Sequence, residues 1–452
     1  MRNIITALIL LLIQECSAQM APSLQFTFIP DWGSVSLLRG KVHNSTLYDH
    51  GVIVYIFVEE AGGWWNKPYA ASAVTNIQPD SSFNTNIAID GNDQFATRII
   101  AFLTPLSFSP PQVSGGELPA ALFAFPHVVS GRPHGNRIIS WSGFDWVVKK
   151  SITNNLIPVG PGPNIFNDND SMVWVDTQEK LHLRIAKRGN EWHCTEIIST
   201  VSQGYNRYEF DLGSRVDLLD PNIIAGIFTW DECSPYAQPP NNYFREIDFE
   251  FSKWGNSGNE NSQYVVQPWS ISGNINRFNM TLTGLSHSIH TFDWTSDSIV
   301  FKSSWGDFTH SWKYTDQASI PSPGNENVRI NFWLLNGIPP SDNRNAELIL
   351  NTFVTNTAEH GHLTEQVKVF PNPVESGCTI DVHSSGVNEA AISITDIYGN
   401  HVKELFAGKL IIGLNRIEWD GMNQHGQPLQ PGLYIICVRN IQEIRYVKLI
   451  KI

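Results

Sequence analysis

Three closely spaced carboxylates are the strongest chemical signal in the sequence. Glu246, Asp248 and Glu250 alternate with apolar residues, so in a β-strand the acidic side chains share one face and the apolar side chains the other. One interpretation is an edge strand with a solvated acidic face. Against it, Asp and Glu are poor strand formers, and like charges on one face repel each other. The other interpretation is a functional site, which the flanking Trp230 and Trp254 would shield from open water.

Paired carboxylates are the groups that cleave glycosidic bonds, because one attacks or activates water while the other protonates the leaving oxygen. On a flat strand, Cα atoms four residues apart are separated by roughly 13 Å. Side chains that lean inward bring two Glu carboxyls within reach of the roughly 5–5.5 Å separation of a retaining pair. Asp248 would lie between Glu246 and Glu250. Neighbouring carboxylates make full ionisation costly, so at least one proton should be held near neutral pH.

The elements around this segment are almost all of the strand type. Short apolar runs rich in Val, Ile, Phe and Tyr recur between clusters of Gly, Pro, Asn, Asp and Ser, and no segment shows the period of a three-turn amphipathic helix. This pattern predicts an all-β chain of packed sheets. Polar, turn-rich segments at 107–116, 128–135 and 355–364 indicate the boundaries. We expect an N-terminal β-sandwich over 20–130, a central domain over 136–357, a linker over 358–365 and a third domain over 366–452.

The amino-acid composition indicates which class of molecule the protein binds. Only 16% of the 452 residues are charged and the net charge is −13, which argues against a nucleic-acid binder because such proteins need clustered Lys and Arg. Eleven of the 15 tryptophans fall in the central domain. Aromatic faces stack on sugar rings, so this skew suggests carbohydrate, while large aromatic cores of a β-sandwich are the alternative explanation.

The N-terminus indicates export. Arg2 precedes an apolar run over 4–13, and small residues at 16–18 precede Gln19, which predicts a secretory signal peptide over 1–18. The run is too short to span a bilayer, and no later segment is long and apolar enough to do so. A lipid anchor on Cys16 is an alternative. We expect the mature protein to be secreted or held on the outer surface after export through the periplasm.

Export permits disulfides, and four cysteines follow the signal peptide: Cys194, Cys233, Cys378 and Cys437. Pairing within the central region and within the tail is one possibility, and buried free thiols are the other.

The acidic segment 246–251 resembles the active-site strand of glycoside hydrolase family 16, the family of lichenases, laminarinases and agarases. The resemblance extends over about 220 residues, that is, over the central domain. The further segments that carry it are 192–200, 204–209, 227–230, 290–299 and 329–333.

This resemblance implies a concanavalin-like jelly roll flanked by two smaller β-sandwich domains. It implies an endo-acting glycoside hydrolase that cleaves a β-linked polysaccharide with retention and without a cofactor. By position, Glu246 would be the nucleophile and Glu250 the acid/base, with Asp248 assisting. The candidate substrate-binding residues are Glu196, Trp230, Trp254, Gln263 and Trp333. A non-catalytic carbohydrate-binding protein on the same jelly roll, or a structural surface adhesin, is the alternative.

The tail resembles the C-terminal sorting domain of the type IX secretion system of Bacteroidota. The matching segments are 370–373, 396–399, 419–421, 431–434 and 447–452. The resemblance implies that the tail is recognised by this secretion machinery and takes no part in catalysis.

Three other signals are weaker. The segment 167–171 (Asn-Asp-Asn-Asp-Ser) suggests a calcium loop but lacks the Gly and the distant Glu of an EF-hand, so we predict a polar turn. The histidines show no zinc-ligand spacing, and we expect no metal site. The segment 63–68 (Gly-Trp-Trp-Asn-Lys-Pro) is either a packed hairpin corner or a sugar-stacking turn.

Overall fold

The structure is a computed structural model of the chain. It describes residues 21–45, 48–68, 73–152, 156–237, 239–285, 287–355, 367–384, 388–396, 401–410, 413–440 and 444–452. The predicted signal peptide (1–18) and the predicted linker (358–365) lie outside the described residues.

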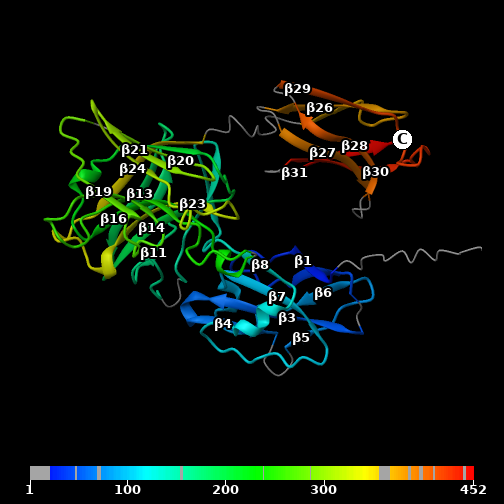
Figure 1. Ribbon diagram of the computed structural model, residues 1–452, viewed down its shortest axis with the longest axis horizontal. Helices are drawn as coiled ribbons and strands as arrows, with labels where there is room; N and C mark the ends of the chain where they lie inside the picture. The colour runs from blue at the N-terminus through cyan, green and yellow to red at the C-terminus, as the bar shows by residue number, and fades with distance from the viewer. Residues whose placement is uncertain are drawn as a thin grey trace, which may run out of the picture.

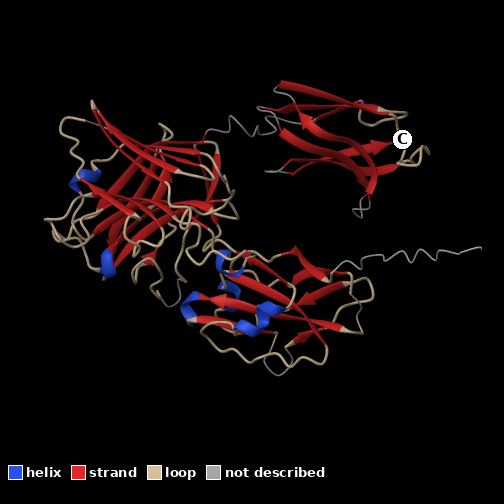
Figure 2. Cartoon of the chain, in the orientation of Figure 1, coloured by secondary structure: helices blue, strands red, loops and turns tan. Residues whose placement is uncertain are grey.

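The described part of the chain is all-β, as the sequence predicts (Figure 2). Its helical segments are short 3-10 turns at the ends of strands and in loops. They are η1 (Glu59–Ala61), η2 (Asp93–Phe95), η3 (Ala120–Ala124), η4 (Val216–Leu218), η5 (Ser234–Tyr236) and η6 (Leu335–Gly337). None of the helices in these residues is long and apolar enough to cross a membrane.

The central domain is a jelly-roll sandwich of two layers, drawn in green to yellow in Figure 1. One layer is ordered β19-β18-β17-β16-β23-β14-β10-β9, and the other is ordered β22-β21-β20-β15-β24-β13-β12. The strands of the first layer are β9 (Arg137–Trp141), β10 (Phe144–Val148), β14 (Glu191–Ser199), β16 (Ile223–Trp230), β17 (Ile247–Phe251), β18 (Ser262–Val266), β19 (Ile275–Phe278) and β23 (Asn327–Leu334). Those of the second are β12 (Val173–Val175), β13 (Leu181–Arg188), β15 (Arg207–Leu212), β20 (Ser288–Trp294), β21 (Ile299–Trp305), β22 (Phe308–Tyr314) and β24 (Ala346–Thr355). A short strand, β11 (Ile165–Phe166), pairs in parallel with β14.

The two layers meet at the β13–β14 hairpin, where Arg188 pairs with Glu191 and Gly189 has a φ of 63° in the turn. Between them lies an aromatic core. Phe249 of β17 is fully buried there and contacts the rings of Phe292 at 5.7 Å and Phe301 at 5.6 Å from the opposite layer. These contacts fix the apolar face of β17 inward, so its acidic face must point out of the sandwich.

The N-terminal domain is a smaller sandwich, drawn in blue to cyan in Figure 1. One sheet contains β1 (Ser23–Phe28), β2 (Leu38–His43) and β6 (Ser82–Thr85), and the other contains β3 (His50–Val58), β4 (Gly63–Lys67), β5 (Val74–Thr75), β7 (Arg98–Pro105) and β8 (His127–Gly131). The segment 63–68 therefore begins with strand β4, and Trp64 is fully buried in it, as expected of a packed hairpin.

The strands β3 and β7 are buried on both faces, which explains their unbroken apolar sequences. One face packs between the two sheets of the sandwich. The other face, which carries Tyr55 and Phe102, is covered by the loop after β7 and by Tyr236 of the central domain. The N-terminal and central domains thus share an apolar contact.

The C-terminal domain is a third sandwich. Its sheets contain β25 (Lys368–Phe370), β26 (Cys378–Ser384) and β29 (Gly413–Trp419) on one side, and β27 (Asn388–Asp396), β28 (His401–Leu410), β30 (Gly432–Asn440) and β31 (Ile444–Lys451) on the other. Side chains from both sheets form one core.

The four described cysteines, Cys194, Cys233, Cys378 and Cys437, are free thiols, so the disulfide pairing considered from the sequence is not formed. Cys194 shows the reason in the central domain: it is fully buried in the core, where its thiol donates to Asn164 Oδ1 at 3.2 Å.

Candidate active site

Strand register brings residues from five strands, four of them polar, into one row across the outer face of the first layer. Glu250 of β17 is paired with Gln263 of β18 and with Gly226 of β16. Gly226 is paired in turn with Asn331 of β23, which faces Glu196 of β14. Because directly opposed residues of antiparallel strands point to the same face, these side chains line up side by side.

A second row runs parallel to the first, two residues along each strand. In it Asp248 is paired with Phe228, and Phe228 with Arg329. Members of both rows form the floor of a cavity of about 320 Å³. Its lining residues are Glu59, Arg98, Lys149, Gly160, Pro161, Glu196, Gly226, Phe228, Trp230, Glu232, Glu246, Asp248, Glu250, Arg329, Asn331 and Trp333.

The structure places all three predicted catalytic carboxylates, Glu246, Asp248 and Glu250, in this cavity. The strand is shorter than the alternation predicts, since β17 begins at Ile247 and Glu246 precedes it. Arg245, with a φ of 56°, makes a turn before Glu246 and is held by an ion pair of 3.0 Å between its Nε and Asp231 Oδ2. The turn, and not the pleat of the strand, therefore sets the position of Glu246.

Burial raises the pKa of all three carboxyls. Its effect on Glu250 is opposed by Gln263 Nε2, which donates to Glu250 Oε2 at 2.5 Å, and by Arg277, and the pKa of Glu250 is raised to about 7. A carboxyl with such a pKa can give up and regain a proton at neutral pH, as a general acid/base must.

The pKa of Asp248 is raised well above its ordinary value by burial, by the charges of Glu246 and Glu250, and by a hydrogen bond to Glu246. Burial and the charge of Glu250 also raise the pKa of Glu246, against the hydrogen bond from Asp248 and the charge of Arg329. The pKa of Glu246 is raised to about 8. Asp248 keeps its proton at neutral pH and donates a hydrogen bond through it to Glu246, which favours the charged form of Glu246 without restoring its ordinary pKa.

The predicted substrate-binding residues fall into two groups. Glu196, Trp230 and Trp333 line the cavity. Gln263 and Trp254 are not among its lining residues. Gln263 instead acts on Glu250 through the hydrogen bond above. Trp254 packs against the core, 6.3 Å from the ring of Trp333.

Two of the lining residues are held in place by neighbours. Glu196 is almost fully buried between Lys149 Nζ at 3.1 Å and Arg329 Nη1 at 3.5 Å, so it is less accessible to a sugar than a substrate-binding role suggests. Trp230 stacks on Phe244 with ring centroids 4.1 Å apart and donates from Nε1 to Glu232 Oε2 at 2.9 Å. Its orientation is therefore fixed before any ligand binds.

Sequence reasoning missed several residues of the cavity. Arg329 and Asn331 lie on the same face of β23 as Trp333 and alternate with the apolar Ile330 and Phe332. This alternation within a buried strand is a signal that could have found them. Nothing in the sequence pointed to Glu59 and Arg98, because they belong to the N-terminal sandwich and reach the cavity only through tertiary packing.

The segment 167–171 is a polar turn in the structure. Its acidic side chains form ion pairs with basic neighbours: Asp168 with Lys150 at 3.3 Å, and Asp170 with Arg137 at 2.7 Å. Within the part of the chain that the structure describes, no group of three or more His, Cys, Asp or Glu side chains is arranged to hold a metal ion.

Comparison with known proteins gives a match to one family model and matches to solved structures. Residues 375–442 match the family model described as a FlgD Ig-like domain. No curated protein matches the chain.

Solved structures similar to the chain are matched over a little under half of its length. They include the catalytic domain of LamA from Zobellia galactanivorans, with 14% identity over 46% of this chain and 89% of that chain, at a TM-score of 0.35. A Bacteroides ovatus protein described as a mixed-linkage glucan family 16 enzyme in complex with a product has 10% identity. The match covers 46% of this chain and 94% of that chain, at a TM-score of 0.35. A Mycobacterium tuberculosis antigen described as a pseudo beta-1,3-glucanase has 16% identity. The match covers 46% of this chain and 89% of that chain, at a TM-score of 0.35.

Proposed function

We propose that the central domain is a glycoside hydrolase that cleaves β-linked polysaccharide with retention of configuration. The observation that carries the proposal is the group Glu246, Asp248 and Glu250. Their three carboxyls line one cavity, and the pKa of each is raised. Structural ion-pair networks neutralise carboxylates with cations, whereas here burial raises the pKa of each member. Such a group is costly to build and suits proton transfer.

In the first step the Glu246 carboxylate attacks the anomeric carbon, and the bond to the leaving oxygen breaks. Glu250 gives its proton to that oxygen, so the departing sugar leaves as a neutral alcohol. In the second step the ionised Glu250 takes a proton from water, and the resulting hydroxide displaces Glu246 from the anomeric carbon. Glu250 regains its proton and Glu246 its charge, which completes the cycle.

The remaining residues of the cavity orient the sugar. Trp230 and Trp333 offer aromatic surface for a pyranose ring, and Asn331 and Arg329 offer hydrogen-bond donors for its hydroxyls. The hydrogen bond from Asp248 orients the carboxylate of Glu246.

The test is a screen of the full chain against laminarin, lichenan, agarose, carrageenan and xyloglucan, with release of reducing ends as the readout. The proposal expects new reducing ends from at least one polysaccharide, and none from the Glu246→Ala variant. Binding of a polysaccharide without any cleavage by the wild type would instead favour the non-catalytic carbohydrate-binding protein.

We also propose that the protein is exported and that its C-terminal sandwich is recognised by type IX secretion machinery. The sequence motifs of the tail and the apolar segment 4–13 support this proposal.

A further inference from the structure

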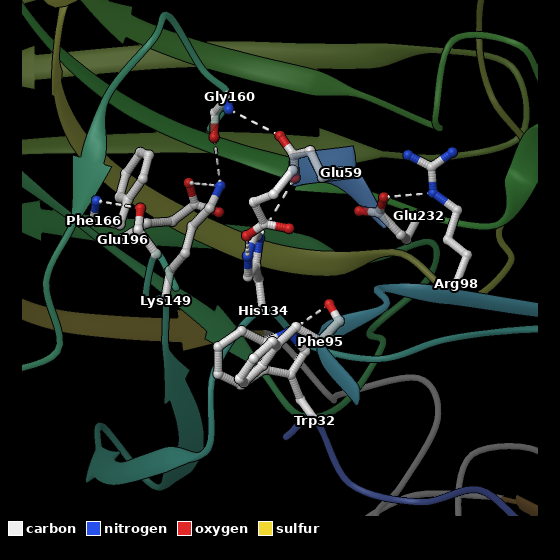
Figure 3. Close-up of polar contacts among 12 residues, drawn as sticks. Trp32, Glu59, Phe95, Arg98, His134, Lys149, Gly160, Phe166, Glu196 and Glu232 are labelled. Carbon is white, nitrogen blue, oxygen red and sulfur yellow. Dashed lines mark hydrogen bonds and ion pairs between the residues drawn. The ribbon is translucent and has the colours of Figure 1, made fainter. Parts of the chain in front are cut away.

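The cavity has walls from two domains. Its floor belongs to the central jelly roll, but Glu59 and Arg98 come from the N-terminal sandwich, where Glu59 follows β3 and Arg98 opens β7. Figure 3 shows both side chains reaching toward residues of the central domain.

A continuous set of contacts closes the β14 side of the cavity. Lys149 Nζ, paired with Glu196, also donates to the carbonyl of Gly160 at 2.7 Å. The backbone N–H of Gly160 donates to Glu59 Oε1 at 2.9 Å (Figure 3). Behind Glu59 lies the buried His134, with its Nδ1 3.5 Å from Glu59 Oε2 and its Nε2 3.0 Å from Glu60 Oε1. The contacts therefore run without a gap from the floor strand β14 into the N-terminal sandwich.

Arg98 makes the second contact between the N-terminal sandwich and the central domain. Its guanidinium lies 4.0 Å from the centre of the Phe57 ring and donates from Nε to Glu232 Oε1 at 2.7 Å. Burial alone would raise the pKa of Glu232, but Arg98 and Arg329 outweigh it and lower this pKa to about 2. Glu232 is therefore ionised at neutral pH, where it pairs with Arg98.

Apolar packing adds to this contact. Trp64 of β4 is fully buried, contacts the ring of Tyr236 at 5.1 Å, and donates from Nε1 to the Tyr236 hydroxyl at 3.2 Å. His127 Nε2 lies 3.1 Å from the carbonyl of Tyr236. Contacts that are both apolar and hydrogen-bonded at one residue favour a fixed arrangement of the two domains over a loose tether.

We propose that the N-terminal sandwich is the end wall of the substrate cleft, with Glu59 beside β14 and Arg98 beside the end of β16 as the residues that determine how many sugar units bind. The proposal rests on the proposed hydrolase function and refines it. A chain that meets a wall cannot pass through the cleft, so the enzyme releases short products from one chain end. Internal cleavage, expected from the sequence resemblance, needs a cleft that is open at both ends.

The dimensions fit a short site. From β17 to β14 the floor crosses three strand spacings of about 4.8 Å, roughly 14 Å in all. The cavity volume of about 320 Å³ lies at the lower end of the roughly 300–1,000 Å³ of sites for small ligands. On this proposal, the space between the carboxylates and the wall holds a short oligosaccharide.

The direct test is the product size of the wild-type full chain on the polysaccharide that it cleaves, sampled early in the digestion. The proposal predicts one dominant short product from the beginning, with little loss of polymer length. Oligosaccharides of defined length, labelled at the reducing end, show which end is held at the wall. An early ladder of long products would overturn the proposal, while the absence of any product would contradict the hydrolase function itself.

A double variant, Glu59→Ala with Arg98→Ala, tests the two residues. We expect KM for short oligosaccharides to rise roughly tenfold, because charge-assisted hydrogen bonds to the sugar are lost, and longer products to appear. The matched control is Arg39→Ala, which removes an exposed arginine of the same sandwich and should change neither quantity. If the double variant folds and its products and KM equal those of the control, the two residues do not bind sugar and the proposal fails.

Discussion

Glu250 is the residue whose surroundings define the chemistry of the site. Burial favours its neutral form, while the amide of Gln263 and the charge of Arg277 favour the carboxylate, and the balance raises its pKa to about 7. The general acid must be protonated when the leaving oxygen departs. Activity should therefore fall as the pH rises through this pKa, which gives the alkaline limb of the pH profile.

Gln263→Leu should move that limb. The substitution removes a hydrogen bond donated to the carboxylate form of Glu250, so it stabilises the protonated form and raises the pKa. We expect the alkaline limb of kcat/KM to shift upward by roughly one pH unit. A downward shift, or none in a folded variant, would contradict the assignment of Glu250 as the acid.

Asp248→Asn should stabilise the fold at alkaline pH. Burial and its neighbours raise the pKa of Asp248 well above 3.8, so the unfolded chain holds fewer protons here than the folded chain as the pH rises above 3.8. Stability conferred by the protonated form is therefore present at low pH and is lost as the pH rises toward the folded-state pKa. We expect the melting temperature of the variant to exceed that of the wild type by a few degrees at pH 8 and to converge with it near pH 4.

Activity of the same variant gives an independent check. The amide that replaces the carboxyl donates a weaker hydrogen bond to Glu246 than the protonated carboxyl does, so we expect a partial loss of kcat. An equal melting-temperature gain at both pH values would show that titration of Asp248 is not its cause.

At the scale of elements, strand alternation predicted much of the site and none of its turns. The alternation over 246–251 correctly placed the apolar side chains in the core and the carboxylates in the cavity. It failed at Glu246, because the strand begins one residue later than the alternation predicts. The cause is the positive φ of Arg245, whose side chain is held by Asp231 outside the alternating segment. The sequence also predicted Trp254 as a substrate-binding residue, whereas its side chain packs against the core. An aromatic residue beside a site and one inside it have the same sequence signal.

Gly226 illustrates a constraint that only the register reveals. It lies between Glu250 and Asn331, and a Cβ at this position would come within 2.5 Å of Asn331 Oδ1. We expect Gly226→Ala to push the Asn331 side chain into the cavity and to raise KM roughly tenfold, by loss of its hydrogen bond to sugar. Steady-state kinetics with a thermal melt measure this. A variant with wild-type KM would show that Asn331 does not contact the substrate.

The exposed Trp269 belongs to the loop after β18. Its side chain is 65% exposed, and its backbone N–H donates to Gln267, whose amide reaches Asp248 Oδ2 at 3.1 Å. In the sheet, β18 lies on the side of β17 that faces away from β14, so this loop is on the opposite side of the carboxylates from Glu59. We expect Trp269→Ala to raise KM for the polysaccharide more than for short oligosaccharides, because the aromatic ring binds the part of the chain that extends out of the cleft. Equal effects on both substrates would argue against this role.

At the scale of the whole molecule, the sequence predicted the all-β architecture but not the cooperation between domains. Strand periods are local, so composition and alternation suffice for the fold class. The contact of Arg98 with Glu232 joins residues 134 positions apart, and no local pattern reports it. The part of the cavity formed by the N-terminal sandwich could be found only from the structure.

The C-terminal sandwich has its own core and supplies no lining residue of the cavity. We expect deletion of 366–452 to leave kcat and KM of the purified protein unchanged within error. In a host with type IX secretion, the truncated chain should accumulate in the periplasm, as measured by cell fractionation. Normal surface delivery of the truncated chain would contradict the proposed role of the tail.

The central claim is that Glu246 attacks the sugar directly, and the configuration of the first product tests it. Proton NMR of a digestion, recorded before mutarotation, distinguishes the α- from the β-anomer of the new reducing end. Two displacements at the anomeric carbon, the first by Glu246 and the second by water, predict the retained β-anomer from a β-linked substrate. An initial α-anomer would mean that water attacks in a single step, and it would contradict the account.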